Sequence, residues 1–233
     1  MPTVLITGAS KGFGRELFDV FLERGWTVFP LVRDAAIADD LKAAAWTSGH
    51  PIVADVTSPD VGNRIFKVLQ AHTKSLDLLV NNAGSIKKLR RLPQLTAEDL
   101  EELFEVHCVG AFRCTLAALP FLRRAERPIV VNITSRKGSI GLTIAGEGGN
   151  VYSYKIAKCA QNMLTACLDQ ELRAEGIRAF AVHPGRLMTD VAPADADTSP
   201  RDAAVKFVDW VESVDRHAVC GMHDLMDGGL IEW

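Results

Sequence analysis

The chain has 233 residues, a net charge of −3 and an ordinary globular composition, with 48% hydrophobic and 24% charged residues. This length suits one large α/β domain, so we expect a single domain over residues 1–233. The small negative charge gives no general attraction to nucleic acid or to an anionic membrane, and we expect neither as a partner.

The cysteines and the N-terminal residues indicate the compartment. The five cysteines are odd in number, include no C-x-x-C pair and fall mostly in helix-like stretches, which is typical of core side chains in a reducing compartment. No His/Cys cluster has the spacing of a metal site. The strand-like run Thr3–Thr7 follows Met1 and Pro2 directly, without a signal-like or membrane-spanning stretch. We therefore expect a cytoplasmic protein without a bound metal.

Short β-rich runs alternate with stretches of helical periodicity along the whole chain. The expected strands are Thr3–Thr7, Trp26–Val32, Ile52–Ala54, Leu78–Val80, Ile129–Ile133, Ile177–Val182 and a weaker one near Val219–Leu225. This alternation predicts an α/β fold: a single-domain, Rossmann-type, doubly wound parallel sheet of about seven strands with helices on both faces. Pro30 lies inside the second run, and because proline cannot donate to a ladder we expect irregular pairing there.

Two helix starts and one long loop are visible in the sequence. Thr96 begins a capping-box pattern before a long helix toward Leu122. Ser199 followed by Pro200 reads as a cap with proline at the first helical position. The polar, Pro/Ala-rich segment 186–202 is too long for a turn and is interpreted as a functional loop.

A glycine-rich turn joins the first strand to the first helix. Its spacing is G-x-x-x-G-x-G, and its context of strand, turn and helix is the one required for a dinucleotide site. Glycine lets backbone N–H groups approach a phosphate, and the helix N-terminus favours an anion. The alternative is a turn that needs glycine for packing alone. The residues expected to contact the cofactor here are Gly8, Ser10, Lys11, Gly12, Phe13 and Gly14.

The end of the second strand indicates which dinucleotide is bound. Sites selective for NAD place an acidic residue there to bind the ribose 2′-OH, whereas NADP sites place arginine nearby. In this chain Val32 takes the acid's position and Arg33 follows, with Lys11 adding a second cation. Asp34 argues for NAD, but we expect it one step past the ribose. NADP is therefore the expected cofactor.

Five short motifs follow one another along the chain. They are Thr7–Gly14, Asn81–Gly84, Asn132–Ser135, Tyr154–Lys158 and Pro184–Gly185. In this order and on these elements, they resemble the short-chain dehydrogenase/reductase family over essentially the whole chain. The stretches Ile133–Ile140, Tyr152–Met163 and His183–Asp190, and the ending at Trp233, further resemble its C-factor/sniffer-like carbonyl reductase branch.

Tyr154 and Lys158 are spaced i, i+4, so they lie on one face of a helix. A tyrosine with a pKa of ~10 is a poor proton shuttle at neutral pH, and a nearby ammonium lowers that pKa by stabilising the phenolate. Tyr154 would donate a proton to a carbonyl oxygen as hydride arrives, and accept it in reverse. Ser135 would hydrogen-bond the same oxygen, with Thr134 and Ser139 as rival hydroxyls. The resemblance implies these roles, and implies that Lys158 also binds the nicotinamide ribose.

Two features depart from the family pattern. The gap from Ser135 to Tyr154 is longer than usual, and its glycine-rich region Ile144–Asn150 predicts a flexible flap. Many family members carry Asn where this chain has His107, and that Asn is implied to hold a water behind the lysine. His107 would hold that water or titrate itself, or it is a histidine satisfied within the helix packing.

The resemblance also implies cofactor contacts outside the glycine turn. They are Asp55 and Val56 for the adenine, Asn82, Ala83 and Gly84 on the ribose side, and Pro184, Gly185, Leu187 and Thr189 for the nicotinamide.

Two basic stretches are weighed as contacts for an anionic group. The run 87–91 is interpreted as a solvated loop, with an acidic partner or substrate group as the alternative. Arg136 and Lys137 directly follow Ser135, and they would favour an anionic substrate if their side chains faced the pocket.

The sequence therefore predicts an NADP(H)-dependent oxidoreductase that transfers hydride between nicotinamide and a small ketone or aldehyde, or an alcohol in reverse. Two alternatives stay open: a sensor or signalling factor that binds the dinucleotide without turnover, and a reductase of C=C bonds. Many relatives assemble through the helices that correspond to 99–122 and 152–172. A homodimer or homotetramer is therefore implied, although the longer flap could interfere.

Overall fold

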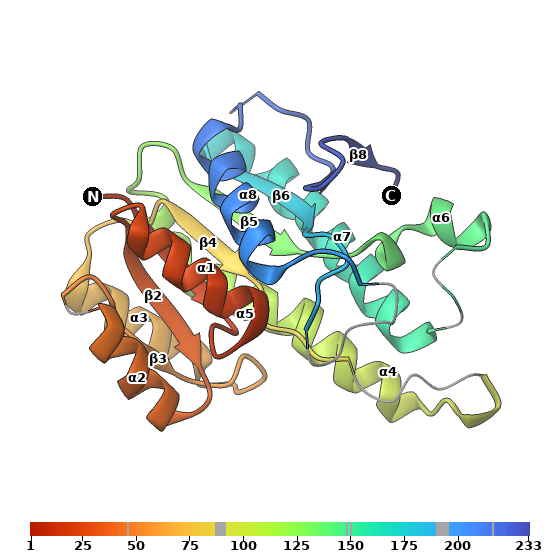
Figure 1. Ribbon diagram of the computed structural model, residues 1–233, viewed down its shortest axis with the longest axis horizontal. Coiled ribbons are helices and arrows are strands. Elements are labelled where there is room, and N and C mark those ends of the chain that lie inside the picture. The colour runs from red at the N-terminus through yellow and green to blue at the C-terminus, as the bar shows by residue number, and fades with distance from the viewer. Residues whose placement is uncertain (46, 87–91, 148, 150, 190–195, 216) are drawn as a thin grey trace.

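The computed structural model describes the chain except for residues 46, 87–91, 148, 150, 190–195 and 216. Within that part, eight strands form one sheet in the order β3-β2-β1-β4-β5-β6-β7-β8 (Figure 1). They are β1 Thr3–Thr7, β2 Thr27–Val32, β3 Ile52–Val53, β4 Leu78–Asn81, β5 Ile129–Ile133, β6 Arg178–His183, β7 Met222–Asp224 and β8 Leu230–Ile231. Every neighbouring pair is parallel except β7–β8. The predicted doubly wound sheet is confirmed, with eight strands where about seven were expected.

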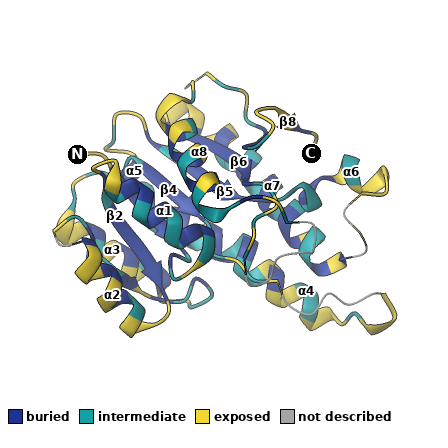
Figure 2. Ribbon diagram, viewed as in Figure 1, coloured by how far each residue is buried: buried dark blue, intermediate teal, exposed yellow. Residues whose placement is uncertain are grey.

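Helices cover both faces of the sheet and enclose two hydrophobic cores. One core includes residues of α1 (Gly12–Glu23), α2 (Ala35–Ala45) and α8 (Pro200–Ser213). The other includes residues of α3 (Val61–His72), α5 (Gly110–Leu122) and α7 (Tyr152–Leu172). The strands form a buried layer between helices that expose their outer faces (Figure 2). The remaining helical elements are η1 Leu92–Gln94, α4 Ala97–Phe104, η2 Glu105–Val109, η3 Arg136–Gly138, α6 Ile140–Ile144 and η4 Arg173–Glu175.

Pro30 lies within β2, and its pairing is continuous on one side and interrupted on the other. Val28 donates its N–H to the carbonyl of Ser48 on the β3 side, and Val32 accepts from Ala54 on that same side. The missing N–H of Pro30 must therefore face β3, because alternate residues of a parallel strand bond to the same neighbour. The β2–β3 ladder begins only after Pro30, whereas the β1–β2 ladder runs through it. The predicted irregular pairing is confirmed.

A chain of buried polar side chains crosses the second core. Asn81 on β4 donates from Nδ2 to Thr115 Oγ1 (3.1 Å) and to Asn132 Oδ1 (2.9 Å). Asn132 on β5 in turn donates to Thr165 Oγ1 at 2.8 Å. Buried amides need such partners, and these bonds tie α5, β4, β5 and α7 together.

The long helix predicted to begin after Thr96 has three parts. Thr96 and Asp99 form the expected capping box on α4. The helix continues through the π-helical turn η2 into α5. Within the described residues, the stretch Ala97–Leu122 is long and apolar enough to cross a membrane by length and composition, with mean hydropathy 1.2. Residues of α5 belong to the second core, whereas Phe104, Phe112 and Leu116 of this stretch are exposed. The absence of a membrane partner stays a prediction.

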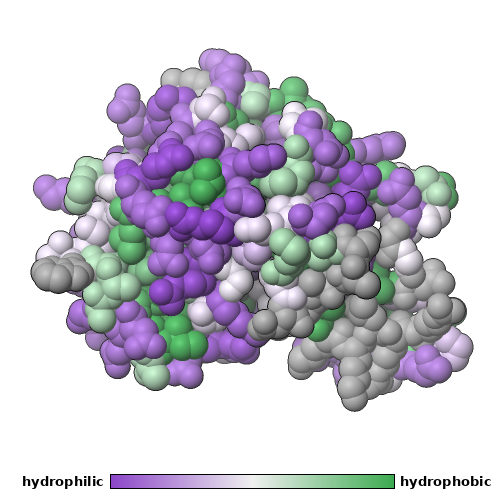
Figure 3. Space-filling view, in the orientation of Figure 1, coloured by the Kyte–Doolittle hydropathy of each residue, from purple (hydrophilic) through white to green (hydrophobic). Residues whose placement is uncertain are grey.

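The helix α8 begins as predicted, with Ser199 accepting a hydrogen bond from the N–H of Asp202 and with Pro200 in its first turn. Its outer face is joined to α1 by ion pairs, including Arg24 with Glu212 at 2.7 Å. This side of the molecule is predominantly hydrophilic (Figure 3). The surface over α1 and α8 is therefore a solvated face.

Candidate active site

The glycine turn after β1 is held in place by the end of β4. The side chain of Asn82 donates from Nδ2 to the carbonyls of Thr7 (3.0 Å) and Gly8 (3.2 Å). Thr7 Oγ1 accepts from the N–H groups of Asn82 (3.0 Å) and Ala83 (2.9 Å). A Cβ on Gly8 would lie 2.8 Å from Ala83 Cα, and Gly8 has a φ of 69°. Glycine is therefore needed both for the backbone conformation and for the close approach of these two segments.

The turn also has the properties of a phosphate site. In the part of the chain that the structure describes, α1 has no side-chain cap and no acidic residue in its first turn. Gly12 has a φ of 56°, and a Cβ there would lie 3.5 Å from Thr189 in the loop after β6. A pyrophosphate fits this cradle of N–H groups at a helix N-terminus. Phe13 is buried and packs edge to face on Phe207, so its backbone alone is left to serve a ligand.

The end of β2 has the charge expected for a 2′-phosphate. Val32 is buried, whereas Arg33 is 81% exposed and its Nη1 lies 3.8 Å from Asp55 Oδ2. Asp34 accepts a hydrogen bond from the N–H of Ala36 at 2.8 Å and so caps α2. The carboxylate of Asp34, which was the argument for NAD, is therefore engaged in capping α2.

Asp55 and Val56 follow β3. Asp55 Oδ1 accepts from the N–H and the hydroxyl of Thr57 at 2.9 and 2.8 Å. Partial burial opposes ionisation, but the hydrogen bonds from Thr57 and the nearby Arg33 prevail and lower the pKa of Asp55. Val56 is buried, and a Cβ on Gly110 would lie 2.9 Å from its side chain. Val56 thus packs on the start of α5.

Ser135 lies beside the phenol of Tyr154. As a hydrogen-bond partner its hydroxyl lowers the pKa of Tyr154, and its Oγ accepts from the N–H of Lys137 at 3.2 Å. Burial raises the pKa of Tyr154 to about 12, while the hydrogen bond from Ser135 acts in the opposite direction. Tyr154 therefore keeps its proton at neutral pH in the cofactor-free protein.

The two rival hydroxyls are engaged elsewhere. Thr134 Oγ1 donates to Asn162 Oδ1 at 2.5 Å in the interior. Ser139 caps α6 by accepting from the N–H of Leu142 at 3.0 Å. Of the three hydroxyls, the one that contacts Tyr154 is Ser135.

Lys158 lies one turn after Tyr154 on α7 and is 4% exposed. Its Nζ donates to the carbonyl of Ile133 at 2.6 Å and to Gln161 Oε1 at 2.8 Å, and lies 5.8 Å from the centroid of the Tyr154 ring. Burial lowers the pKa of Lys158 to about 7. The expected pairing of a phenol and an amine on one helix face is present.

His107 occupies the π-helical turn η2 and packs against the same tyrosine. Its Nε2 lies 2.9 Å from the carbonyl of Ser85, and in the described structure its buried Nδ1 has no partner. Burial, assisted by the charge of Lys158, lowers the pKa of His107 to about 3. The imidazole is therefore neutral at physiological pH, and its buried Nδ1 can accept a hydrogen bond. A Cβ on Gly84 would lie 2.6 Å from its ring, so the glycine that ends the motif Asn81–Gly84 makes room for the histidine.

The loop after β6 is pinned at both of its ends. Leu187 forms a parallel bridge with Thr198, and Met188 donates its N–H to the carbonyl of Thr198 at 2.9 Å. Gly185 has a φ of 99°, and a Cβ there would lie 2.8 Å from Met226. Buried Pro184 precedes it. The predicted functional loop is thus anchored beside the glycine turn, although residues 190–195 lie outside the described part.

Arg136 is occupied by carboxylates. Its guanidinium lies 3.4 Å from Asp224, 3.5 Å from Glu147 and 4.0 Å from Asp227. The alternative that Arg136 faces the pocket to attract an anionic substrate therefore loses its basis, because these acids offset its charge. The basic run 87–91 lies outside the described residues, as do residues 148 and 150 of the predicted flap.

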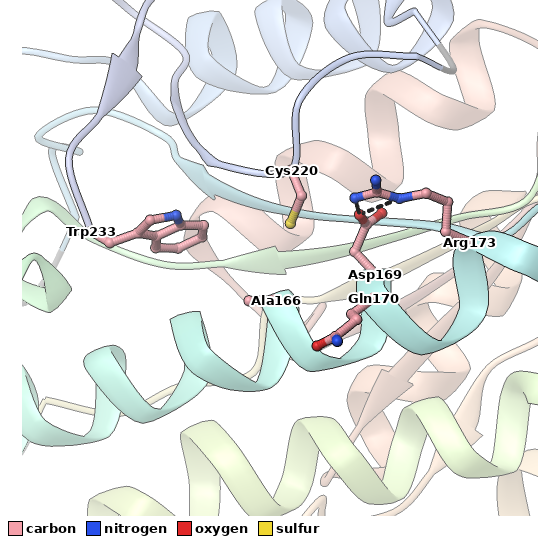
Figure 4. A pocket seen from close by; sticks show the side chains of 6 residues that line it. All are labelled: Ala166, Asp169, Gln170, Arg173, Cys220 and Trp233. Carbon is pink, nitrogen blue, oxygen red and sulfur yellow. Dashed lines mark hydrogen bonds and ion pairs between the residues drawn. The ribbon is translucent and has the colours of Figure 1, made fainter.

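A hollow of about 310 Å³ lies at the far end of α7 from Lys158 (Figure 4). Its wall includes Asp169, which is buried and binds both Arg173 and Arg178. The ion pair between Asp169 on α7 and Arg178 on β6 joins these two elements. Among the described residues, no cluster of three or more His, Cys, Asp or Glu side chains suits a metal.

The model of the short chain dehydrogenase family matches residues 2–199. The chain belongs to the short chain dehydrogenase family. As members of that family are, this dehydrogenase is a dinucleotide-dependent oxidoreductase. Human retinol dehydrogenase 5 is 34% identical over 190 residues, which make up 81% of this chain and 57% of that protein.

Solved structures of carbonyl reductases are similar to this dehydrogenase. The NADPH-bound carbonyl reductase from chicken fatty liver has a TM-score of 0.90 and 25% identity, covering 100% of this chain and 99% of that one. The carbonyl reductase Sniffer of D. melanogaster has a TM-score of 0.91 over the whole of both chains, and at 24% identity it shows the fold alone. The resemblance drawn from the sequence motifs is confirmed.

Two residues that contact the predicted site residues were not predicted from the sequence. Gln161 follows Lys158 by three residues, and Asp224 is far along the chain from Arg136. Each becomes apparent only from a contact in the structure. The spacing i, i+3 from a candidate lysine is the one pattern that could have pointed to Gln161.

Proposed function

We propose that this dehydrogenase is an NADP(H)-dependent carbonyl reductase, acting on a small ketone or aldehyde and in reverse on an alcohol. The observation that carries the proposal is that the buried Lys158 has its Nζ 5.8 Å from the centroid of the Tyr154 ring, while Ser135 lowers the pKa of the same phenol as a hydrogen-bond partner. Serine, phenol and amine would then act together on a substrate next to the nicotinamide of a cofactor whose pyrophosphate the glycine turn receives. A protein that only bound the dinucleotide would have no use for this arrangement.

The cofactor would be held by backbone and by charge. The glycine turn from Gly8 to Gly14 would receive the pyrophosphate, and Arg33 would pair with the 2′-phosphate of NADP. Support for NADP comes from the exposed Arg33 beside a buried Val32, and from the use of Asp34 as a helix cap. When bound, NADPH supplies a hydride, which carries two electrons to the carbonyl carbon.

The protein's own residues would supply the proton and hold the oxygen. Ser135 would hydrogen-bond the carbonyl oxygen, and Tyr154 would give that oxygen its phenolic proton. The raised pKa of Tyr154 keeps the proton in place until the reaction, which suits the reductive direction. Lys158, as an ammonium, would stabilise the phenolate that is left and would bind the cofactor ribose.

His107 would complete the proton path. Its neutral imidazole leaves Nδ1 as a buried acceptor close to the charge of Lys158. A water bound there would connect the lysine to solvent and restore the proton to Tyr154 after each turnover. This role fits the ring contact between His107 and Tyr154.

The two tyrosines of this chain provide the test and its control. Purified protein is mixed with NADPH and a panel of ketones and aldehydes, and loss of the reduced-nicotinamide absorbance is followed. Tyr154→Phe should lose turnover by about 10²- to 10⁴-fold. Tyr152→Phe, which alters the partly exposed tyrosine two residues earlier, should keep it.

Three outcomes would count against the proposal. Turnover that survives in Tyr154→Phe removes the proton-transfer role. NADPH binding without turnover on any compound favours a sensor or signalling factor. Reduction of C=C bonds in preference to C=O bonds gives a different reaction class.

A further inference from the structure

Gln161 lies inside the protein against Lys158, and nothing in the proposed function uses it. Its side chain is 1% exposed on α7, and its Oε1 accepts the hydrogen bond from Lys158 Nζ at 2.8 Å. Glutamine is seldom fully buried without a specific partner. The partner here is the amine that the reaction needs.

The lysine has a fixed number of donors to distribute. An ammonium carries three N–H groups, and two of them go to the carbonyl of Ile133 and to Gln161. We propose that Gln161 is a positioning residue: with Ile133, it holds Lys158 as an ammonium and leaves the third N–H for Tyr154 and the cofactor ribose. This inference rests on the proposed function for its catalytic meaning.

The neighbours of Lys158 explain why an amide oxygen matters there. Burial lowers the pKa of Lys158 to about 7. The titratable groups facing it are Tyr154 on its own helix and His107 from η2, whose pKa of about 3 makes it neutral. The turn η3 contacts the lysine through the uncharged Gly138. An acceptor within hydrogen-bond distance stabilises the charged form, so Gln161 acts against the desolvation.

A purely structural glutamine makes a different prediction from a positioning one. Gln161→Met keeps the length of the side chain and removes the acceptor, while Gln161→Glu keeps the acceptor and adds a negative charge. A packing role predicts similar losses in both variants. The positioning role predicts that they move the titration of Lys158 in opposite directions, by about one to two pH units.

The first test uses the cofactor-free protein and measures Tm as a function of pH. The folded pKa of about 7 lies below the value of ~10.4 for an unfolded lysine, so the unfolded chain binds more protons between these pH values and stability rises with pH. In Gln161→Met this rise should begin at lower pH than in wild type. In Gln161→Glu it should begin at higher pH. The matched controls are Gln170→Met and Gln170→Glu, at an exposed glutamine on the same helix, and they should leave the curve unmoved.

The second test measures kcat and KM for NADPH-linked carbonyl reduction across pH. Activity needs the ammonium and falls as pH rises through the pKa of Lys158. This fall in activity should therefore occur at lower pH in Gln161→Met and at higher pH in Gln161→Glu than in wild type. Curves that shift in the same direction in both variants, or that fall uniformly without moving, overturn the inference. A wild-type protein that reduces no carbonyl removes the proposed function, but the Tm test still decides the Gln161–Lys158 contact.

Discussion

The imidazole of His107 meets the ring of Tyr154 edge to face, with centroids 5.5 Å apart and planes at 89°. His107 stands in a π-helical turn, a form that is rare in proteins and frequent at functional sites. The extra residue of such a turn changes which side chain a helix directs inward. In this chain the turn places a neutral, deeply buried histidine against the phenol.

Replacement of His107 should change how stability depends on acid. The folded pKa of about 3 lies below the ordinary 6.5, so the unfolded chain binds a proton that the folded protein does not, and stability falls as pH drops from 6.5 toward 3. At pH 5 this group should cost roughly 2 kcal/mol relative to pH 7.5. His107→Asn should remove that part of the acid sensitivity, as measured by urea unfolding at both pH values. Identical losses in wild type and variant would mean that the histidine is protonated in the fold.

Ser135 and Thr134 should separate activity from stability. Ser135→Ala should lower kcat by about 10²- to 10³-fold, because it removes the donor that orients the substrate oxygen. Its Tm should change little, since the side chain is only partly buried. Thr134→Val removes the hydrogen bond to Asn162 and should instead cost about 1–3 kcal/mol of stability, with catalysis retained. The reverse pattern would assign the catalytic hydroxyl to Thr134.

Arg33 should determine the preference between the two nicotinamide cofactors. Arg33→Ala removes the exposed cation at the end of β2, and a charge-assisted bond to phosphate is worth about 1.5–3 kcal/mol. Affinity for NADPH should therefore fall about 10- to 150-fold while affinity for NADH stays nearly constant, as measured by nucleotide fluorescence titration. Arg24→Ala, which alters an arginine on the α1–α8 surface, is the control. Equal losses for both cofactors would place the 2′-phosphate elsewhere.

Gly14 should tolerate no side chain. A Cβ there would lie 2.3 Å from the carbonyl of Gly8 and 2.4 Å from Asn82 Nδ2, so Gly14→Ala must displace the turn. We expect a loss of about 1–3 kcal/mol in stability together with weaker NADPH binding. Gly229→Ala, at a glycine with open space around it, should change neither quantity. An unchanged affinity for NADPH in Gly14→Ala would mean that the glycine turn does not bind the phosphates of the cofactor.

The parts of the fold that depend on neighbouring residues, such as strands and helix caps, could be predicted from the sequence. The strands Thr3–Thr7 and Ile129–Ile133 have the predicted bounds, and Ser199 caps α8 as expected, because hydrophobic runs and caps are written in neighbouring residues. The two-residue strand β8 has no such signal. The π-helical turn was also missed: four of its five residues are weak helix formers, but that composition alone does not distinguish a π-turn from an ordinary helical turn.

The candidate site divides in a similar way. Spacing along one helix predicts the proximity of Tyr154 and Lys158, whereas it cannot tell which of three hydroxyls reaches the tyrosine. That choice depends on Thr134 being taken by Asn162, a partner 28 residues away. The occupation of Arg136 by Asp224, 88 residues away, is equally invisible to local patterns.

The facing amides of Asn81 and Asn132 have a consequence for how the sheet assembles. Aliphatic strands can slide along one another with little change in contact area, and a slip by two residues would keep the same faces buried. Here such a slip of β4 along β5 would separate two amides that are directly opposite and hydrogen-bonded, and Asn132 Oδ1 would lose its donor in an apolar interior. The pair therefore favours one register of β4 and β5. Because Asn132 also bonds to Thr165, it fixes the position of α7 relative to the sheet.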